Sequence, residues 1–328
     1  MRITILFGGT NKERLVSVAS AQAMHAALPE ADLWFWDVTD TVHEVSSQAL
    51  RNHARPFEDA FNPGNRGIGL EAALDKAMAE ERVLVLGLHG GSAENGELQA
   101  MCEMRGIAFT GSGSASSHLA FDKVAAKRFA FIAGVKAPEG IALDDIDAAL
   151  AEYGKLIAKP ARDGSSYGLI FVSAKQDLVA VRNAAKTEEY VIEPFISGVE
   201  ATCGVLEQSD GSVIALPPIE IVPAEGGFDY TAKYLLKSTQ EICPGRFAPE
   251  ITAQIMDQAL TAHQALSCSG YSRTDFIISQ KGPVYLETNT LPGLTKASLY
   301  PKSLKVQGIE FADFLQGQID LAQKRTRK

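Results

Sequence analysis

The hydrophobic pattern of the first third of the chain predicts an α/β unit. Residues 2–7 alternate like a strand and end at Gly8-Gly9, and the following apolar positions recur at helical spacing: Val16, Ala19, Ala23 and Ala27. Residues 83–88 form a continuous apolar run, which is typical of a parallel strand buried on both faces. His89 follows at the carboxyl end of that strand, where open α/β sheets bind ligands.

In the middle of the chain, the pattern predicts helices first and then a series of strands. After a helix that stops at Gly106, a second helix is expected over about residues 114–133 and ends at Gly134. A region richer in strands follows, with candidates at 155–160, 169–172, 188–196, 199–206 and 213–222.

Residues 223–247 are polar and too long for a simple hairpin, so they are interpreted as a functional lid loop. A helix at 250–267 and strands at 273–279 and 283–288 complete the pattern. We therefore expect three parts: an N-terminal α/β subdomain at 1–110, a central subdomain at 111–206 and a C-terminal subdomain at 207–328.

Composition excludes several classes of protein. The chain has 328 residues, 46% of them hydrophobic, which is enough for a substantial core. The net charge of −9 argues against a nucleic-acid partner. Four widely spaced cysteines without a CxxC pair support neither a disulfide framework nor a zinc site. No apolar run reaches membrane-spanning length, so a cytoplasmic protein without a membrane partner is expected.

The segment from Lys159 to Gly168 combines a cation with a small, hydroxyl-rich turn that contains Ser165 and Ser166. Such a loop can direct backbone N–H groups at phosphate oxygens while the lysine supplies charge. Taken alone the signal is weak, because most Gly-Ser turns between strands are only turns.

The last two predicted strands carry a more informative pattern. Period-two alternation puts Arg273 and Asp275 on one face, and Glu287 and Asn289 on one face. If the strands form a hairpin, the two faces converge, and two carboxylates with an amide oxygen beside a polyphosphate form a hard-oxygen Mg²⁺ site. A solvated polar sheet face is the alternative, but charges flanked by such apolar residues need partners.

An ordered set of motifs carries a resemblance over nearly the whole chain. The motifs are Gly8-Gly9-Thr10 with Glu13-Arg14 and Val16-Ser17, His89-Gly90 with Glu94-Asn95-Gly96 and Leu98-Gln99, Thr110-Gly111-Ser112-Gly113 with Asp122-Lys123, Lys159-Pro160 with Gly164-Ser165-Ser166, Asp229-Tyr230 with Lys233-Tyr234, Arg273-Thr274-Asp275, and Glu287-Thr288-Asn289-Thr290 with Pro292-Gly293 and Ser298-Leu299. Together they resemble the D-alanine–D-alanine ligase family. No P-loop motif GxxxxGK[ST] occurs, which excludes a P-loop kinase.

The resemblance implies an ATP-grasp fold with the nucleotide held between the central and C-terminal subdomains. It implies an ATP-binding set of Lys123, Lys159, Ser166, Glu193, Phe195, Glu200 and Lys233. Within this set Glu193 and Glu200 match the adenine-side and ribose-side contacts, and Phe195 would pack on the base. Without the family pattern, these three residues read as ordinary strand-edge positions.

The metal, catalytic and substrate roles also follow from the resemblance. Asp275, Glu287 and Asn289 match ligands of two Mg²⁺ ions, for which Mn²⁺ is a possible substitute. The implied catalytic residues are Ser165, Tyr234, Arg273 and Gly293, and the implied substrate-binding residues are His89, Ser298 and Leu299.

The implied reaction has two steps and small-molecule substrates, ATP and amino acids. The first D-alanine would be converted to an acyl phosphate, and the amine of the second would displace phosphate for cell-wall precursor synthesis. Water would destroy the acyl phosphate, so the 223–247 loop is a sensible lid. Tyr234 favours an amine acceptor over a hydroxyl acceptor, and a homodimer through the N-terminal subdomain is implied.

One position departs from the family pattern. A glutamate two residues after the position of Glu13 binds the first substrate's ammonium in the family, in a triad with residues matching Ser165 and Tyr234, and here that position is Leu15. Either another acid serves the ammonium, with Glu13 the nearest in sequence, or the first substrate carries its amino group elsewhere, altered or not at all. A nucleotide-binding pseudoenzyme is a further alternative, disfavoured because Lys159, Arg273 and the three metal-ligand candidates all remain.

Overall fold

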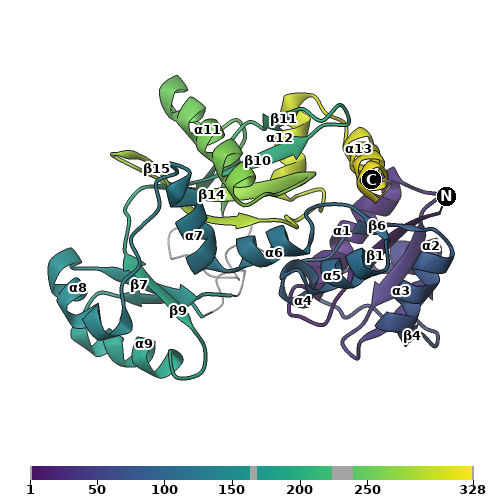
Figure 1. The fold of residues 1–328 in the computed structure, drawn as a ribbon, viewed down its shortest axis with the longest axis horizontal. Helices are drawn as coiled ribbons and strands as arrows, with labels where there is room; N and C mark the ends of the chain where they lie inside the picture. The colour runs from purple at the N-terminus through teal and green to yellow at the C-terminus, as the bar shows by residue number, and fades with distance from the viewer. Residues whose placement is uncertain (1, 163–167, 224–238, 327–328) are drawn as a thin grey trace.

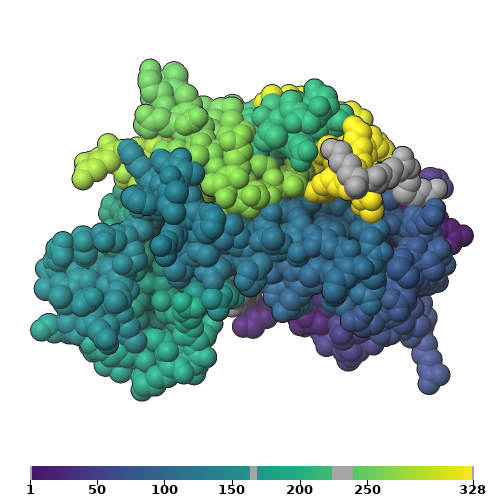
Figure 2. Space-filling view, in the orientation of Figure 1, coloured from purple at the N-terminus to yellow at the C-terminus, as the bar shows by residue number. Residues whose placement is uncertain are grey.

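The structure is a computed structural model, and it describes residues 2–162, 168–223 and 239–326. Three sheets organise the described chain (Figure 1). Figure 2 shows the green and yellow C-terminal segments lying directly against the blue segments of the first part of the chain. The cavity described below is lined by residues from the first and last of these parts.

The N-terminal sheet has the strand order β4-β3-β2-β1-β5-β6. Its strands are β1 (Ile3–Gly8), β2 (Asp32–Trp36), β3 (Thr41–Val45), β4 (Ile68–Gly69), β5 (Val83–Leu86) and β6 (Ala108–Phe109). β1 pairs in parallel with β2 and β5, and every residue of β5 is buried. The expected parallel pairing is confirmed for β2, β1, β5 and β6, whereas β3 and β4 pair antiparallel at one edge of the sheet. The helices of this part are α1 (Arg14–Ala27), α2 (Ser47–Asn52), α3 (Leu70–Ala79), α4 (Gly91–Glu94) and α5 (Glu97–Met104).

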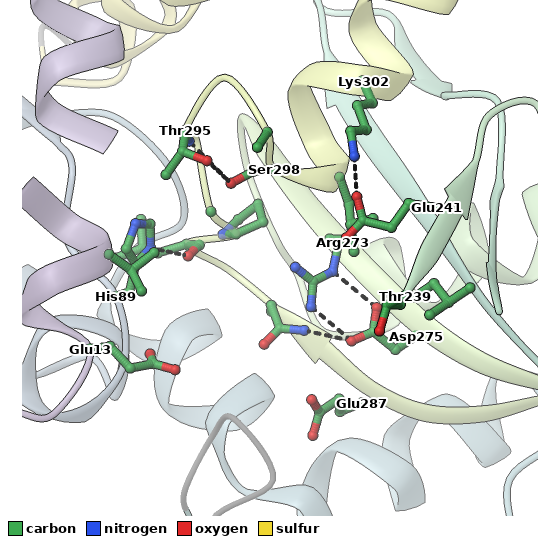
Figure 3. A pocket seen from close by; sticks show the side chains of 18 of the residues that line it. Glu13, His89, Thr239, Glu241, Arg273, Asp275, Glu287, Thr295, Ser298 and Lys302 are labelled. Atoms are coloured by element: carbon green, nitrogen blue, oxygen red, sulfur yellow. Dashed lines mark hydrogen bonds and ion pairs between the residues drawn. The ribbon is translucent and has the colours of Figure 1, made fainter. Parts of the chain in front are cut away.

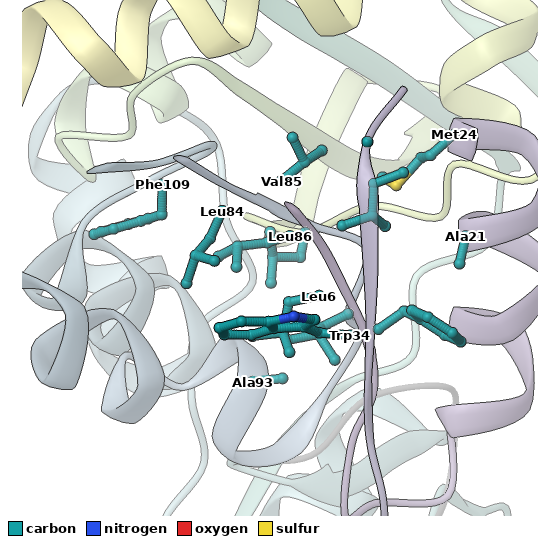
Figure 4. Close-up of a cluster of buried hydrophobic side chains, with 14 of the residues drawn as sticks. Leu6, Ala21, Met24, Trp34, Leu84, Val85, Leu86, Ala93 and Phe109 are labelled. Atoms are coloured by element: carbon teal, nitrogen blue, oxygen red, sulfur yellow. The ribbon is translucent and has the colours of Figure 1, made fainter. Parts of the chain in front are cut away.

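The largest core cluster joins this sheet to the C-terminal part of the chain. Around Trp34, the side chains of Leu6, Leu84 and Leu86 close the space between strands and helices (Figure 4). The same cluster continues to Tyr271 on a C-terminal strand. Because packed cores resist deformation, this continuity fixes the carboxyl ends of β1 and β5 against the C-terminal sheet.

The connection to the middle of the chain differs from the predicted single helix over 114–133. Two helices are present, α6 (Ser114–Phe121) and α7 (Lys123–Ile132), with a break at Asp122. Asp122 has extended backbone, and its side chain accepts hydrogen bonds of 3.0 Å from the backbone N–H groups of Val124 and Ala125. An aspartate that caps a new helix competes with helix continuation, which periodicity alone does not reveal.

A three-stranded antiparallel sheet with the order β8-β7-β9 forms the middle part. Its strands are β7 (Leu156–Pro160), β8 (Ile170–Val172) and β9 (Tyr190–Pro194). The helices α8 (Ile146–Tyr153) and α9 (Leu178–Ala184), with the 3₁₀ turns Leu143–Asp145 and Lys175–Asp177, lie beside it (Figure 1).

The C-terminal sheet has the order β13-β12-β10-β14-β15, with β11 also paired to β10. Its strands are β10 (Val199–Glu207), β11 (Val213–Ala215), β12 (Ile219–Val222), β13 (Gln240–Ile242), β14 (Tyr271–Ser279) and β15 (Gly282–Asn289), and its helices are α11 (Pro249–Ala265), α12 (Leu299–Gln307) and α13 (Phe311–Thr326). The predicted strand 213–222 is divided in two around Pro217-Pro218, because proline has no N–H for a sheet ladder. β13 lies inside the stretch predicted as a loop.

β10 pairs with β14 from Val199 to Leu206, although the prediction assigned residues 199–206 to the central subdomain. The subdomain limits themselves stay a prediction. Across the described ranges, no helix combines the length and apolar character that a membrane span requires.

A buried histidine between α11 and β14 predicts acid-sensitive stability. Burial lowers the pKa of His263 to about 4, and its Nδ1 lies 2.7 Å from Ser272 Oγ. The unfolded chain therefore binds one more proton than the folded chain between about pH 4 and about pH 6.5, and stability is lost as the pH falls through this window.

We expect this histidine to contribute a slope of up to about 1.4 kcal/mol per pH unit to the free energy of unfolding. Urea unfolding of the parent and of His263→Gln across this window measures it, and the variant should have the shallower slope. His118→Gln, an exposed position on α6, is the matched control. Equal slopes in all three proteins would contradict the prediction.

Candidate active site

A cavity of about 330 Å³ lies between the loops of the N-terminal sheet and the C-terminal sheet (Figure 3). The N-terminal wall contributes Glu13, Val16, Phe57, His89 and Glu94. The rest of the lining is Glu200, Ile221, Thr239, Glu241, Arg273, Asp275, Glu287, Asn289, Leu291, Pro292, Gly293, Thr295, Ala297, Ser298, Leu299 and Lys302. Nine of the residues that the sequence analysis singled out for ATP, metal, substrate or catalysis therefore line one cavity.

The antiparallel pairing of β14 with β15 brings four of these side chains together, as the sequence predicted. Arg273 is opposite Asn289, and Asp275 is opposite Glu287, with a bulge directly after Asp275. Arg273 Nε donates to Asp275 Oδ1 at 3.0 Å, and its Nη2 donates to Oδ2 at 2.8 Å. This two-pronged ion pair holds the guanidinium in a fixed orientation at the cavity wall.

The oxygen atoms of Asp275, Glu287 and Asn289 suit a hard divalent cation. Asp275 is buried, and Asn289 Nδ2 donates to it at 3.3 Å, so the three side chains are neighbours. Within the described ranges, no three His, Cys, Asp or Glu side chains gather in a manner that would hold a metal by themselves. Two carboxylates and an amide oxygen are donors that fit Mg²⁺, which commonly takes one or two carboxylates and completes its shell with phosphate and water.

Three lysines gather beside Glu193 and Glu287. Lys123 Nζ lies 3.4 Å from Glu287 Oε2, and Lys159 Nζ lies 3.6 Å from Glu193 Oε2. Lys127, one helical turn after Lys123, forms an ion pair with the other oxygen of Glu193. Cations so close together in a buried setting suit a polyphosphate, whose charge would balance them.

Lys127 is the functional candidate that sequence reasoning missed. Its burial, together with the neighbouring charge of Lys159, lowers the pKa of Lys127 to about 7. The i, i+4 spacing from Lys123 was a visible signal, because those positions share a helix face. Its relevance depended on Glu193 of β9 lying opposite, which no local pattern indicates.

The residues predicted to contact the adenine and the ribose differ in their surroundings. Glu193 is 2% exposed, and its carboxylate contacts the two lysines. Phe195 is 40% exposed, and its ring lies edge-on to Phe171 at 6.1 Å between centroids. Glu200 lines the cavity from β10. Their contacts with a nucleotide stay a prediction.

His89 is buried in a neutral state at the N-terminal wall. Its Nδ1 lies 2.9 Å from the carbonyl oxygen of Leu291, which can only accept, so Nδ1 carries the proton. Nε2 then accepts from Ser20 Oγ at 2.8 Å. Burial lowers the pKa of His89 to about 4, so the ring contributes no positive charge at neutral pH.

The opposite wall presents the start of α12. Ser298 occupies its N-cap position, and Ser298 Oγ lies 2.7 Å from Thr295 Oγ1 and accepts from Thr295 N at 3.1 Å. Leu299 is the first residue of the helix, whose free N–H groups attract an anion. A Cβ on Gly293 would lie 2.9 Å from Ser298 Oγ, so glycine lets the loop approach this serine closely.

Comparison with known proteins decides the family. Family models described as D-ala D-ala ligase N-terminus and C-terminus match residues 2–112 and 147–320. A D-alanine–D-alanine ligase from Nitrosomonas europaea is 35% identical, over 98% of this chain and 97% of its own length. The chain belongs to the D-alanine–D-alanine ligase family.

Two solved structures are also similar to this chain. The VanG D-Ala:D-Ser ligase from Enterococcus faecalis has a TM-score of 0.78 and 31% identity, over 98% of this chain and 99% of its own. A D-alanine–D-alanine ligase from Bacillus anthracis complexed with ATP has a TM-score of 0.75 and 25% identity, over 100% of this chain and 99% of its own. The expected ATP-grasp fold and the class of ATP-dependent carboxylate–amine ligase are thereby confirmed.

Four predicted site residues of this ligase lie outside the described residues. They are Ser165, Ser166, Lys233 and Tyr234. Beyond the second of these gaps, Thr239 and Glu241 line the cavity, and Glu241 forms an ion pair with Lys302 on α12. The sequence analysis did not identify this pair, because neither residue belongs to a motif.

Proposed function

We propose that this ligase joins two D-alanine molecules to D-alanyl-D-alanine for peptidoglycan precursor synthesis. The observation that carries the proposal is the convergence of Arg273, Asp275, Glu287 and Asn289 on one cavity, beside the cluster of Lys123, Lys127 and Lys159. The family match and the curated relatives favour D-alanine over the alternatives considered.

Within this proposal Asp275, Glu287 and Asn289 would hold two Mg²⁺ ions, and Mn²⁺ would accept the same oxygen ligands. When bound, such ions neutralise charge on the phosphate oxygens and align them. The lysine cluster contributes to the same end, with Lys123 and Lys159 assigned to phosphate oxygens of ATP.

In the first step, an oxygen of the first D-alanine carboxylate forms a bond to the γ-phosphorus of ATP, and ADP leaves. In the second step, the amine of the second D-alanine forms a bond to the acyl carbon, and phosphate leaves with a proton released from the amine. Arg273 and the backbone N–H of Gly293 are assigned to the oxyanion of the tetrahedral intermediate. Ser298 and the N–H of Leu299 are assigned to the carboxylate of the second D-alanine.

Two alternatives make different predictions. A ligase with another first substrate would form ADP with a different carboxylic acid, as Leu15 suggests. A pseudoenzyme would bind ATP without forming ADP. Neither is favoured by the relatives, which are described as D-alanine–D-alanine ligases.

A panel of amino and hydroxy acids tests the proposed function. Phosphate release would be measured with D- and L-alanine, D-serine and D-lactate, and the mass of each product determined. D-serine is included because a relative of known structure is a D-Ala:D-Ser ligase. D-alanyl-D-alanine as the main product is the expected result, whereas ADP formed only with another first acid would refute the D-alanine assignment.

Lys159→Ala should mainly damage nucleotide use. Removing one charge-assisted contact in a partly enclosed site costs roughly 1.5–3 kcal/mol, so we expect the KM for ATP to rise by about one to two powers of ten. Lys155→Ala, an exposed lysine directly before β7, is the matched control and should behave like the parent. An unchanged KM for ATP and unchanged turnover in Lys159→Ala would leave Lys159 as an ordinary strand residue.

The homodimer and the cytoplasmic location belong to this proposal as predictions. Both are consistent with the family, and neither changes the assignment of the cavity residues.

A further inference from the structure

The second substrate brings a carboxylate to the cavity that stays charged throughout the proposed reaction. The carboxylate of the first substrate becomes the acyl phosphate, whereas that of the second forms no bond and keeps its full negative charge. Such a group loses water in an enclosed site, and this loss is costly unless cations or N–H groups contact the carboxylate. Within the proposed function it lies at Ser298 and the N–H of Leu299, which supply a hydroxyl group and a partial charge only.

Among the described residues that line the cavity, the side chains that are cationic at neutral pH are Arg273 and Lys302, because His89 is neutral. Arg273 directs two of its N–H groups at Asp275, at 3.0 and 2.8 Å. Lys302 belongs to α12 and lies on the side of the cavity that carries Ser298 (Figure 3). Lys302 is therefore the cation whose place suits the carboxylate of the second substrate.

Lys302 lies one helical turn after Ser298. Its backbone N–H donates to the carbonyl oxygen of Ser298 at 3.3 Å. Side chains four positions apart occupy the same face of a helix, with Cβ atoms about 5–6 Å apart, and both of these residues line the cavity. One carboxylate and the flexible lysine stem can span such a separation, so a single group can contact both side chains.

The packing of α12 keeps this face directed at the cavity. Tyr300 is buried, and its hydroxyl group donates to the carbonyl oxygen of Val205 at 2.9 Å. Ser303 Oγ donates to the carbonyl oxygen of Pro217, also at 2.9 Å. Positions 300 and 302 differ by about 200° around a helix, so burying Tyr300 against the sheet turns Lys302 to the opposite side.

Glu241 holds the head of the lysine at the cavity wall. Glu241 lies on β13, lines the cavity itself and forms an ion pair with Lys302 Nζ. The two side chains are 25% and 35% exposed, so the pair is not enclosed by protein. An ammonium group has three N–H donors, and it can therefore bind a second carboxylate while it keeps Glu241.

We propose that Lys302 binds the carboxylate of the second substrate, and that this contact makes the ligase select an acceptor with a free carboxylate. The inference rests on the proposed function, because it requires an amino acid as the acceptor. It assigns a specificity role to Lys302: an acceptor of nearly the same size and shape, but without the negative charge, is disfavoured.

Competition between D-alanine and D-alaninamide as acceptors tests this role. With either acceptor, the amine nitrogen forms a bond to the acyl carbon, phosphate leaves, and the amine releases a proton. Mass spectrometry separates the products, D-alanyl-D-alanine and D-alanyl-D-alaninamide. Because both acceptors compete for one acyl phosphate, the product ratio at fixed concentrations reports acceptor recognition, independently of ATP and of the first substrate.

Lys302→Met should lower the ratio of D-alanyl-D-alanine to D-alanyl-D-alaninamide about tenfold. This value corresponds to the lower end of the range for a charge-assisted contact, because the lysine is partly exposed. A general disturbance of the fold would slow both products alike and leave their ratio unchanged. With hydroxylamine as the acceptor, which has no carboxylate, Lys302→Met should keep the parent's KM for the first D-alanine.

Two further variants serve as controls. Lys305→Met removes the same charge from an exposed position of α12 outside the cavity and should match the parent in product ratio. Lys302→Arg keeps a cation at the cavity wall and should retain most of the parent's preference for D-alanine. Thermal unfolding of each variant verifies that the fold is retained.

The outcomes separate this inference from the proposed function. A parent that forms D-alanyl-D-alanine, with an unchanged product ratio in Lys302→Met, would overturn the role of Lys302 and leave the proposed function standing. A parent that forms neither D-alanyl hydroxamate nor D-alanyl-D-alanine would overturn the proposed function and this inference together.

Discussion

Glu287→Gln is expected to reduce ADP formation by at least about 100-fold, corresponding to about 2.7 kcal/mol in the barrier. Glu287 is opposite Asp275 in the strand register, and its Oε2 lies 3.4 Å from Lys123 Nζ. The amide keeps the shape of the side chain but removes its charge, so both the proposed Mg²⁺ ligand and the partner of Lys123 are lost. Steady-state ADP release at saturating ATP and Mg²⁺ measures the effect.

Glu220→Gln is the matched control for this variant. Glu220 is also a buried carboxylate of the C-terminal sheet with a cationic partner, Arg246, but it does not line the cavity. Its replacement should lower stability and leave ADP formation near that of the parent. Turnover of Glu287→Gln within about tenfold of the parent, about 1.4 kcal/mol in the barrier, would show that the metal assignment is wrong.

Arg273→Lys is expected to lower kcat by about 100- to 1,000-fold, the range observed when one donor to a developing oxyanion is lost. The lysine keeps a positive charge opposite Asp275, so that carboxylate is not left buried without a cation. It cannot reproduce the planar fork that pairs with Asp275 at 3.0 and 2.8 Å while facing the cavity. Initial rates of dipeptide formation, with ATP and D-alanine both saturating, isolate kcat.

The same substitution at Arg246 is the control. Arg246 pairs with Glu220 through two hydrogen bonds of 2.8 and 2.7 Å, which matches the Arg273–Asp275 geometry at a position outside the cavity. Arg246→Lys should therefore report the cost of losing a forked ion pair without loss of catalysis. If Arg273→Lys retained kcat within about tenfold, Arg273 would be a structural partner of Asp275 and not a catalytic residue.

Local sequence patterns were sufficient for the elements that build the site. The apolar run at 83–88 predicted β5 because a strand buried on both faces excludes polar residues throughout. Alternation around Arg273 and Glu287 predicted which side chains share a face, and the antiparallel register of β14 and β15 confirmed their convergence. In these cases the side-chain period of two carries the information within a few residues.

The bounds of one helix and one strand could not be predicted from hydrophobic periodicity alone. The helix predicted over 114–133 breaks at Asp122, because its carboxylate caps the following helix. The strand predicted over 213–222 ends before Pro217-Pro218, because two consecutive residues lack N–H donors. In both places hydrophobic periodicity continued across a residue whose backbone or side chain interrupts the element.

The walls of the cavity were decided only by tertiary structure. Glu94 accepts a hydrogen bond from Leu291 N, 197 positions along the chain, and Lys127 meets Glu193 from a different element. A Cβ on Gly90 would lie 2.5 Å from Glu13 Oε2, so the place of this carboxylate in the cavity wall depends on a glycine far along the chain. Sequence patterns state which face of an element a residue occupies; what lies opposite that face depends on how separate elements pack, because those contacts join distant parts of the chain.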